Sequence, residues 1–377
     1  MRSTSGVQII GFDHIRAFAA LLVFMWHFMH PPFGLTPFGQ LPDFFASSIF
    51  NEGHTGVALF MTLSGFIFSF LSFGKDIDLK QFYINRFLRV FPLLFFWCIF
   101  WVAFQNETAP KIALNLFTLL DNRQMPAGGW TVIVEIQFYL LFPFIHPIIE
   151  KKYHEKKLWG VFSYVIPFLI FTQFLRWGVY MKTGSAQTIA YWTIFGRVDQ
   201  FLLGVLTFYI YRSVIINWSS RKSAFTLTII SLLFLSFYRW FNSVGGYYKY
   251  DSYPSSAIIW IIIPTIEGIF YGLFISLYLN ISQNFHGKLS KLLSYIGTLS
   301  YSIYLSNFFM IPILEHAHSL YPFTNENTFG EYFSWGIIIG FPAICIFSLF
   351  TYYYVEHPFL ERRKRYISTI TKHNPQL

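Results

Sequence analysis

The chain has 377 residues, of which 54% are hydrophobic and 12% are charged, and its mean hydropathy is +0.47. Soluble domains carry about 25% charged residues, so this composition excludes a water-soluble globular protein. The formal charge of +9 would suit a nucleic-acid-binding protein, but the placement of the basic residues explains that charge without nucleic acid.

A helix that crosses a bilayer needs about 20 mainly apolar residues. The sequence therefore predicts an all-α integral membrane protein with about ten transmembrane helices. In chain order these are 9–30, 56–73, 87–104, 130–149, 159–181, 189–211, 224–241, 256–279, 293–314 and 332–355. The apolar run 111–120 is too short to span and is expected on the outer surface. We expect one membrane domain over 1–377 with no appended soluble domain.

The basic residues between these helices lie mainly on one side. Cytoplasmic loops are enriched in Lys and Arg, so we place the N-terminal side in the cytoplasm. That side then carries 19 of them: Arg2, Lys75, Lys80, Arg86, Arg89, Lys151, Lys152, Lys156, Lys157, Arg212, Arg221, Lys222, Lys288, Lys291, Arg362, Arg363, Lys364, Arg365 and Lys372. The other side carries 4: Lys111, Arg123, Lys182 and Lys249. Both termini are therefore predicted to be cytoplasmic, with the lipid bilayer as partner and no role for nucleic acid.

The first predicted helix carries Asp13, Arg16 and His27. Arg16 and His27 are eleven residues apart, which places them on one helix face about 16 Å apart along the axis. Arg16 then lies in the cytoplasmic third of the helix and His27 in the outer third. Ionisable residues at such depth are costly and mark function by default.

Four polar residues of other helices are predicted at a depth similar to that of His27. They are Glu135, Arg197, Asp199 and Asn307. Together with His27 they predict a polar cavity inside the membrane. Two further buried cations, Arg176 and Arg239, fall near outer helix ends, where we expect their side chains to extend to the interface.

Arg86 and Arg89 lie at the cytoplasmic edge, three residues apart, and so share a helix face. Paired arginines suit phosphate through bidentate contacts, although topology-setting charge is the alternative. With Arg16 they form a predicted cationic path toward His27. A histidine is a suitable general base at neutral pH, and a nearby carboxylate such as Glu135 can orient it.

Seven segments resemble membrane-bound acyltransferase family 3, the O-antigen acetylase type. They are Phe12–Arg16 with His27, Leu59–Phe66, Arg86–Pro92, Trp130–Thr131 with Glu135–Tyr139, Arg197–Gly204, Ser300–Leu305 and Tyr354–Phe359. They occur in order over nearly the whole chain, on helices of the expected orientation. Each motif alone is weak, and the agreement of all seven in register carries the resemblance.

The resemblance implies transfer of an acyl group, usually acetyl, from cytoplasmic acyl-CoA to a hydroxyl of an outer-face glycan or lipid-linked sugar. His27, Glu135 and Arg16 would then be catalytic. Arg86, Arg89 and Arg16 would bind the donor, acetyl-CoA, which acts as a co-substrate, and no permanently bound cofactor is expected. We expect substrate contacts from Asp13, Arg197, Asp199 and Asn307. The chain departs from the family at Asn307, where a His is common, and we interpret the change as substrate variation.

Several alternatives remain at this point. His27 and His30 have the spacing of a metal pair, but no carboxylate or thiolate accompanies them, so no metal is expected. Ser64 could be a nucleophile, although helix packing at Gly65 explains the pair better. Glu356 could be catalytic or form a structural ion pair. Glu315, His316 and His318 could contact substrate or belong to a solvated loop.

The rival class of function is a secondary transporter or flippase for a sugar or lipid. Such a protein would also need charged groups at depth and a basic cytoplasmic rim. Transporters of this size often have two matching halves with broken helices, and the sequence has no such halves. We expect the location to be a bacterial inner membrane.

Overall fold

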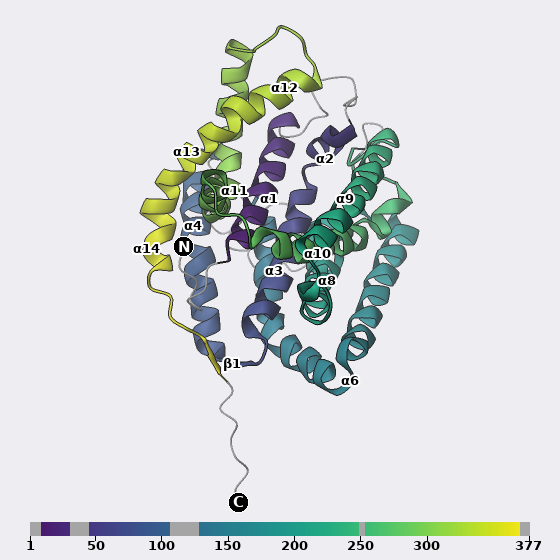
Figure 1. The fold of residues 1–377 in the computed structure, drawn as a ribbon. Coiled ribbons are helices and arrows are strands. Elements are labelled where there is room, and N and C mark those ends of the chain that lie inside the picture. The colour runs from purple at the N-terminus through teal and green to yellow at the C-terminus, as the bar shows by residue number, and fades with distance from the viewer. Residues whose placement is uncertain (1–8, 31–44, 106–127, 249–252, 370–377) are drawn as a thin grey trace, which may run out of the picture.

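The computed structural model describes residues 9–30, 45–105, 128–248 and 253–369, and these residues are almost entirely helical (Figure 1). The helices are α1 (Ile10–Met29), α2 (Ser48–Asn51), α3 (Thr55–Ser72), α4 (Leu79–Gln105), α6 (Trp130–Thr183), α7 (Gln187–Trp192), α8 (Ile194–Ser213), α9 (Ser220–Ser243), α10 (Ile263–Ser282), α11 (Lys288–Leu320), α12 (Phe329–Trp335), α13 (Phe341–Thr351) and α14 (His357–Leu360). Short 3₁₀ turns lie at η1 (Phe45–Ser47), η3 (Ile215–Asn217) and η5 (Ile258–Ile261). The run 111–120 lies outside the described residues.

Eight of the described helices are long and apolar enough to cross a membrane. The sequence predicts about ten, and two elements explain the difference. Helix α1 coincides with the first predicted span, but its polar residues lower its mean hydropathy, and it is not among the eight. Helix α6 contains the two predicted spans 130–149 and 159–181 within one run of 54 residues.

Helix α6 is bent back on itself in its middle. Lys156 and Lys157 have non-helical backbone angles, and Lys157 has a positive φ of 54°. Close approach of the two limbs requires Gly160, because a Cβ there would lie 2.1 Å from the carbonyl oxygen of Lys152. The two limbs diverge from this turn, at the bottom of the molecule in Figure 1.

The last predicted span, 332–355, lies within a continuous helical run from Phe329 to Leu360. Two π-helical turns interrupt it, η6 (Gly336–Gly340) and η7 (Tyr352–Glu356). Each is followed within two residues by a proline, Pro342 or Pro358. Proline lacks the backbone N–H and disturbs the regular hydrogen-bond ladder, which is consistent with irregular turns at these points.

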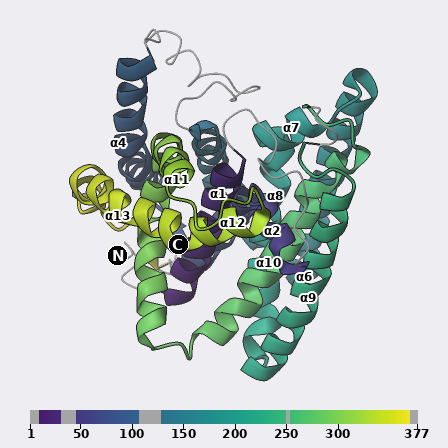
Figure 2. The same cartoon turned by 90° about the horizontal axis from the view of Figure 1, so that it is seen from above.

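Helix α1 lies inside the molecule, surrounded by other helices in the view of Figure 2. It packs against α3, α10 and α11. Glycines allow the closest contacts: a Cβ on Gly297 of α11 would lie 1.9 Å from the carbonyl oxygen of Asp13. Because α1 is buried on nearly all sides, its polar residues face protein and not lipid.

A two-stranded sheet joins two distant parts of the chain. Strand β1 (Lys75–Ile77), between α3 and α4, pairs antiparallel with β2 (Ile367–Thr369), which follows α14. Lys75 pairs with Thr369 and Ile77 with Ile367. The chain after the last helix is thereby held beside the start of α4.

Candidate active site

A central cavity lies between α1, α3, α4, α6 and α11, and its volume is about 130 Å³. Its wall contains Arg16, Ser64, Arg86, Arg89, Thr131, Glu135, Tyr139, Ser300, Tyr301 and Tyr304, together with apolar side chains of α3 such as Val57, Phe60 and Phe68. Val57 and Phe68 are eleven residues apart, so the cavity follows α3 for roughly 16 Å. Four predicted site residues, Arg16, Arg86, Arg89 and Glu135, therefore share one cavity.

The two arginines of α4 lie at one end of this cavity, which we call the arginine end. The Arg86 guanidinium is surrounded by aromatic rings, with its carbon 5.1 Å from the centre of the Phe68 ring and 5.7 Å from that of Tyr139. No carboxylate among the described residues forms an ion pair with Arg86, and its buried Nε has no hydrogen-bond partner there. An anion that enters the cavity could therefore bind this cation.

Arg89 has a different environment. Its NH1 donates to Oε1 of Glu356, and the other oxygen of Glu356 accepts from the Ser302 hydroxyl at 2.8 Å. Glu356 is 1% exposed. Of the two roles left open for Glu356, the structure supports the structural ion pair, and it holds Arg89 in the cavity wall.

Arg16 reaches the cavity from α1. Its NH1 donates to Asp13 Oδ1 at 2.9 Å, one turn earlier on the helix, and Asp13 Oδ2 accepts from Ser294 at 3.1 Å. Asp13 itself is not part of the cavity wall. In this arrangement Asp13 orients Arg16 and anchors α1 to α11.

Glu135 lies in the cavity wall and is joined to α3. Its Oε1 accepts a hydrogen bond from Ser64 Oγ at 2.7 Å. Ser64 also lines the cavity, while its neighbour Gly65 makes the close helix contact: a Cβ there would lie 2.1 Å from the Phe201 carbonyl oxygen. The predicted packing role of Gly65 is confirmed, and Ser64 has a polar partner that the sequence did not indicate.

At the far end from the arginines, Tyr304 and Thr131 line the cavity. Thr131 Oγ1 donates to Tyr304 Oη at 2.7 Å, and Tyr304 Oη donates to the carbonyl of Gly128 at 2.8 Å. We call this the tyrosine end. The two hydrogen bonds tie α11 to the start of α6.

His27 lies beyond the tyrosine end. Its ring is 5.2 Å from that of Phe308, which is one turn after Tyr304 on α11. Its Nδ1 is 2.8 Å from the carbonyl oxygen of Val23. A carbonyl can only accept, so Nδ1 carries the proton and Nε2 has a free lone pair. His27 and Glu135 share no hydrogen bond or ion pair in the described part of the chain.

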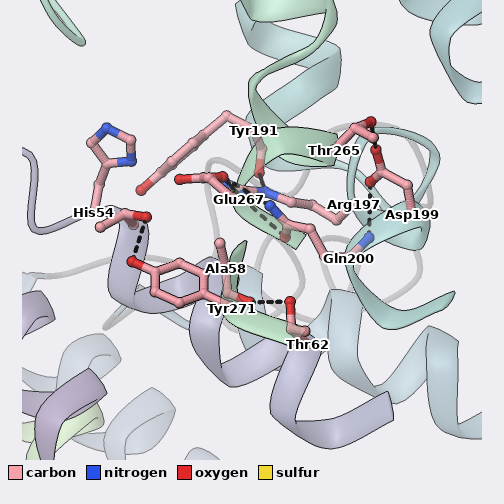
Figure 3. A network of polar contacts seen from close by, with 12 residues as sticks. His54, Ala58, Thr62, Tyr191, Arg197, Asp199, Gln200, Thr265, Glu267 and Tyr271 are labelled. Carbon is pink, nitrogen blue, oxygen red and sulfur yellow. Dashed lines mark hydrogen bonds and ion pairs between the residues drawn. The ribbon is translucent and has the colours of Figure 1, made fainter. Parts of the chain in front are cut away.

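Arg197 and Asp199 belong to a second polar cluster, between α8 and α10. Arg197 pairs with Glu267 at 3.5 Å and stacks on Tyr191 at 4.5 Å. Figure 3 shows Arg197 and Glu267 facing each other, with Gln200 donating to Glu267 Oε2 at 2.9 Å. All of these side chains are buried, and none lines the central cavity.

Asp199 does not pair with its sequence neighbour Arg197. It accepts from Arg176 at 2.8 Å and from Thr265 at 2.6 Å. The expectation that Arg176 extends to the membrane interface is wrong, because its side chain is fully buried and also donates to the carbonyls of Gly196 and Ile261. The buried carboxylate of Asp199 on α8 stabilises the guanidinium of Arg176 on α6 inside the protein.

Asn307 is fully buried on α11, and neither its Nδ2 nor its Oδ1 has a hydrogen-bond partner among the described residues. Buried polar groups are normally paired. Asn307 does not line the central cavity, and its contact with a substrate stays a prediction.

Sequence reasoning missed several residues of these two sites. Tyr139, Tyr301 and Tyr304 line the cavity, but each belongs to a helix so rich in apolar residues that a hydroxyl gives little signal. Glu267 had a usable signal, because it is the only Asp, Glu, Lys, Arg or His of the predicted span 256–279. Its partner lies 70 residues away in sequence, which only the fold reveals.

Comparison with known proteins identifies the family. The family model Acyl_transf_3, described as an acyltransferase domain, matches residues 9–356. The chain belongs to this acyltransferase family. It is also 22% identical over 309 residues to a protein of Acidianus two-tailed virus named "Putative acetyltransferase ORF330", covering 80% of this chain and 82% of the viral protein. No solved structure matches the chain. The predicted resemblance is thus confirmed, and the chain is a membrane acyltransferase with several apolar helices.

Proposed function

We propose that this acyltransferase moves an acyl group, acetyl by default, from cytoplasmic acyl-CoA to a hydroxyl of a carbohydrate or lipid-linked sugar on the outer face of a bacterial inner membrane. The observation that carries the proposal is the central cavity, with arginines at one end and, past its other end, a histidine with a free Nε2. The cavity thereby leads from a site suited to phosphate toward a site suited to proton transfer.

The arginine end supports binding of the donor. Acyl-CoA carries its phosphates at one end and its thioester at the end of a long flexible arm. Arg86 offers a cation with no carboxylate partner in the described part of the chain, and Arg89 and Arg16 add fixed positive charge. Phosphates bound there would leave the arm to follow the cavity along α3 toward the tyrosine end.

The His27 end supports activation of the acceptor. In the direct route, Nε2 of His27 takes the proton of the acceptor hydroxyl as the oxygen attacks the thioester carbonyl carbon. The C–S bond breaks, and the thiolate of the donor leaves and is protonated. In the alternative route His27 itself accepts the acyl group and passes it to the acceptor. Glu135, in the cavity wall, would orient the acceptor, and Arg16 would hold the donor at the arginine end.

Mass spectrometry of surface glycans tests this proposal, on cells with and without the protein. We expect a mass increase of one acyl unit that depends on the protein and is absent with the His27→Ala variant. Glycans of equal mass in both strains, with a sugar or lipid moved across the membrane instead, would contradict acyl transfer and favour a transporter.

A further inference from the structure

The segment after α14 lies at the arginine end of the cavity. Asn85, one residue before Arg86, donates from Nδ2 to the Lys364 carbonyl at 2.6 Å and accepts from the Lys364 amide at 3.1 Å. Strand β2 then pairs with β1. These backbone contacts fix the position of residues 362–369, and the family motif of this region ends before them, at Phe359.

One aromatic side chain of this segment, Tyr366, lies near the Arg86 guanidinium. Tyr366 is 2% exposed, its ring centre lies 5.9 Å from the Arg86 guanidinium carbon, and its ring contacts that of Phe82 at 5.4 Å. The Tyr366 hydroxyl is buried without a hydrogen-bond partner among the described residues. The segment therefore forms part of the surroundings of the unpaired cation.

The same segment brings further positive charge to this end. Burial, and then the charges of Arg89 and Arg86, lower the pKa of Arg363. Burial and the charge of Arg365 lower the pKa of Lys75 on β1. Like charges at short range destabilise one another, so a bound anion would relieve the repulsion.

Most of the acidic groups at this end have contacts of their own. Glu356 is engaged by Arg89, and Glu361, which is exposed, is 3.8 Å from His357. Asp78 accepts from the amide of Gln81 at the start of α4. Asp76 lies on β1, and no ion pair to it is formed by the described residues. Glu150 accepts from the amide of Gly74, next to Lys75, at 2.7 Å, and Glu135 lines the same cavity as Arg86. Six basic residues gather at this place: Arg86, Arg89, Arg363, Lys364, Arg365 and Lys75.

We propose that residues 363–366 and Lys75 form, with Arg86 and Arg89, the binding site for the nucleotide phosphates of the donor, and that Arg363 contacts those phosphates directly. The proposal rests on the proposed function, in which the donor is acyl-CoA. Anionic lipid headgroups carry the same phosphate chemistry, but they would lie at the membrane surface. Arg363 is half-buried, and the backbone of the next residue, Lys364, is bonded to Asn85, one residue before Arg86. This position beside the cavity wall favours the soluble donor.

Equilibrium binding to the full-length protein in nanodiscs of neutral lipid tests the proposal. The probes are acetyl-CoA and acetyl-pantetheine, which lacks the nucleotide and its phosphates. The variant is Arg363→Gln. The matched control is Arg362→Gln, which removes the same charge from the adjacent, exposed residue, whose guanidinium stacks on Phe359 at 5.5 Å. A repeat in nanodiscs with anionic lipid separates donor from headgroup.

We expect Arg363→Gln to weaken acetyl-CoA binding about tenfold in neutral lipid, with binding of acetyl-pantetheine unchanged and Arg362→Gln close to wild type. Equal acetyl-CoA binding by all three proteins would overturn this inference and leave the proposed function intact. An effect of Arg363→Gln that appears only in anionic lipid would also overturn it, in favour of a headgroup site. If the wild-type protein binds no acetyl-CoA, the proposed donor itself is wrong.

Discussion

In the proposed mechanism His27 is the general base, because its hydrogen bond to Val23 fixes the tautomer and no described residue bonds Nε2. Removing a general base typically costs a factor of 10² to 10⁴ in rate. We therefore predict that His27→Ala lowers acyl transfer by that order while the protein still inserts into membranes. The measurement is the transfer rate per inserted molecule.

His316→Ala is the matched control, since His316 is exposed near the end of α11. It should retain the wild-type rate. A His27→Ala protein as active as the control would remove His27 from the mechanism.

Ser64 orients Glu135 through a single short hydrogen bond. A hydrogen bond to a charged group contributes about 1.5–3 kcal/mol, so Ser64→Ala should lower kcat roughly tenfold or more. The KM for acyl-CoA should be unchanged, because the arginine end is intact. Steady-state kinetics on the purified protein would measure both.

Ser69→Ala provides the comparison for this change. Ser69 is buried on the same helix α3 but does not line the cavity. A decrease in kcat of the same size in both variants would indicate a general effect on packing and would contradict an orienting role for Ser64.

At the scale of elements, the contact between α3 and α8 depends on two glycines. A Cβ on Gly65 would lie 2.1 Å from the Phe201 carbonyl oxygen, and one on Gly204 would lie 2.0 Å from the Thr62 carbonyl oxygen. Backbone atoms cannot move aside as side chains do. The two contacts fix the position of α8, which carries Arg197, against α3, which forms part of the cavity wall.

We predict that Gly65→Ala forces the two helices apart and lowers thermal stability in detergent by several degrees. Gly178→Ala on α6 is the control, because a Cβ there meets nothing within 4 Å. Alanine also favours helix over glycine by about 1 kcal/mol, so the control should be as stable as wild type or more. A Gly65→Ala protein with the stability of the control would contradict the close contact.

At the scale of the whole molecule, the functional arrangement requires that the arginine end faces the cytoplasm. The exposed residues Ser368 on β2 and Ser319 on α11 lie toward opposite predicted sides of the membrane. In intact cells a membrane-impermeant thiol reagent should label Ser319→Cys but not Ser368→Cys. Both variants should react in lysed cells.

The two native cysteines, Cys98 and Cys345, lie within apolar helices, and a protein without the added cysteines gives the background labelling. Labelling of Ser368→Cys in intact cells would reverse the assigned orientation. It would also place the donor site on the wrong side for cytoplasmic acyl-CoA.

The sequence by itself determined the membrane-spanning helices, the asymmetry of basic charge and the cationic path of Arg16, Arg86 and Arg89. These features follow from hydropathy and helical spacing, which fix the depth and the face of each side chain along its own helix. The sequence grouped Glu135 with His27, Arg197, Asp199 and Asn307, whereas the structure places Glu135 in one cavity with the three arginines. Hydropathy does not give the connection between spans: it does not show that 130–149 and 159–181 join as the two limbs of α6.

Only the tertiary structure decided which polar groups meet. Arg197 pairs with Glu267, Arg176 with Asp199, and Ser64 with Glu135, although sequence proximity suggested Asp199 for Arg197. Sequence spacing cannot give the rotation of one helix relative to another, and that rotation selects the partner of every buried charge. For the same reason His27 and Glu135, predicted at one depth, make no direct contact, since His27 lies past Tyr304 and against Phe308.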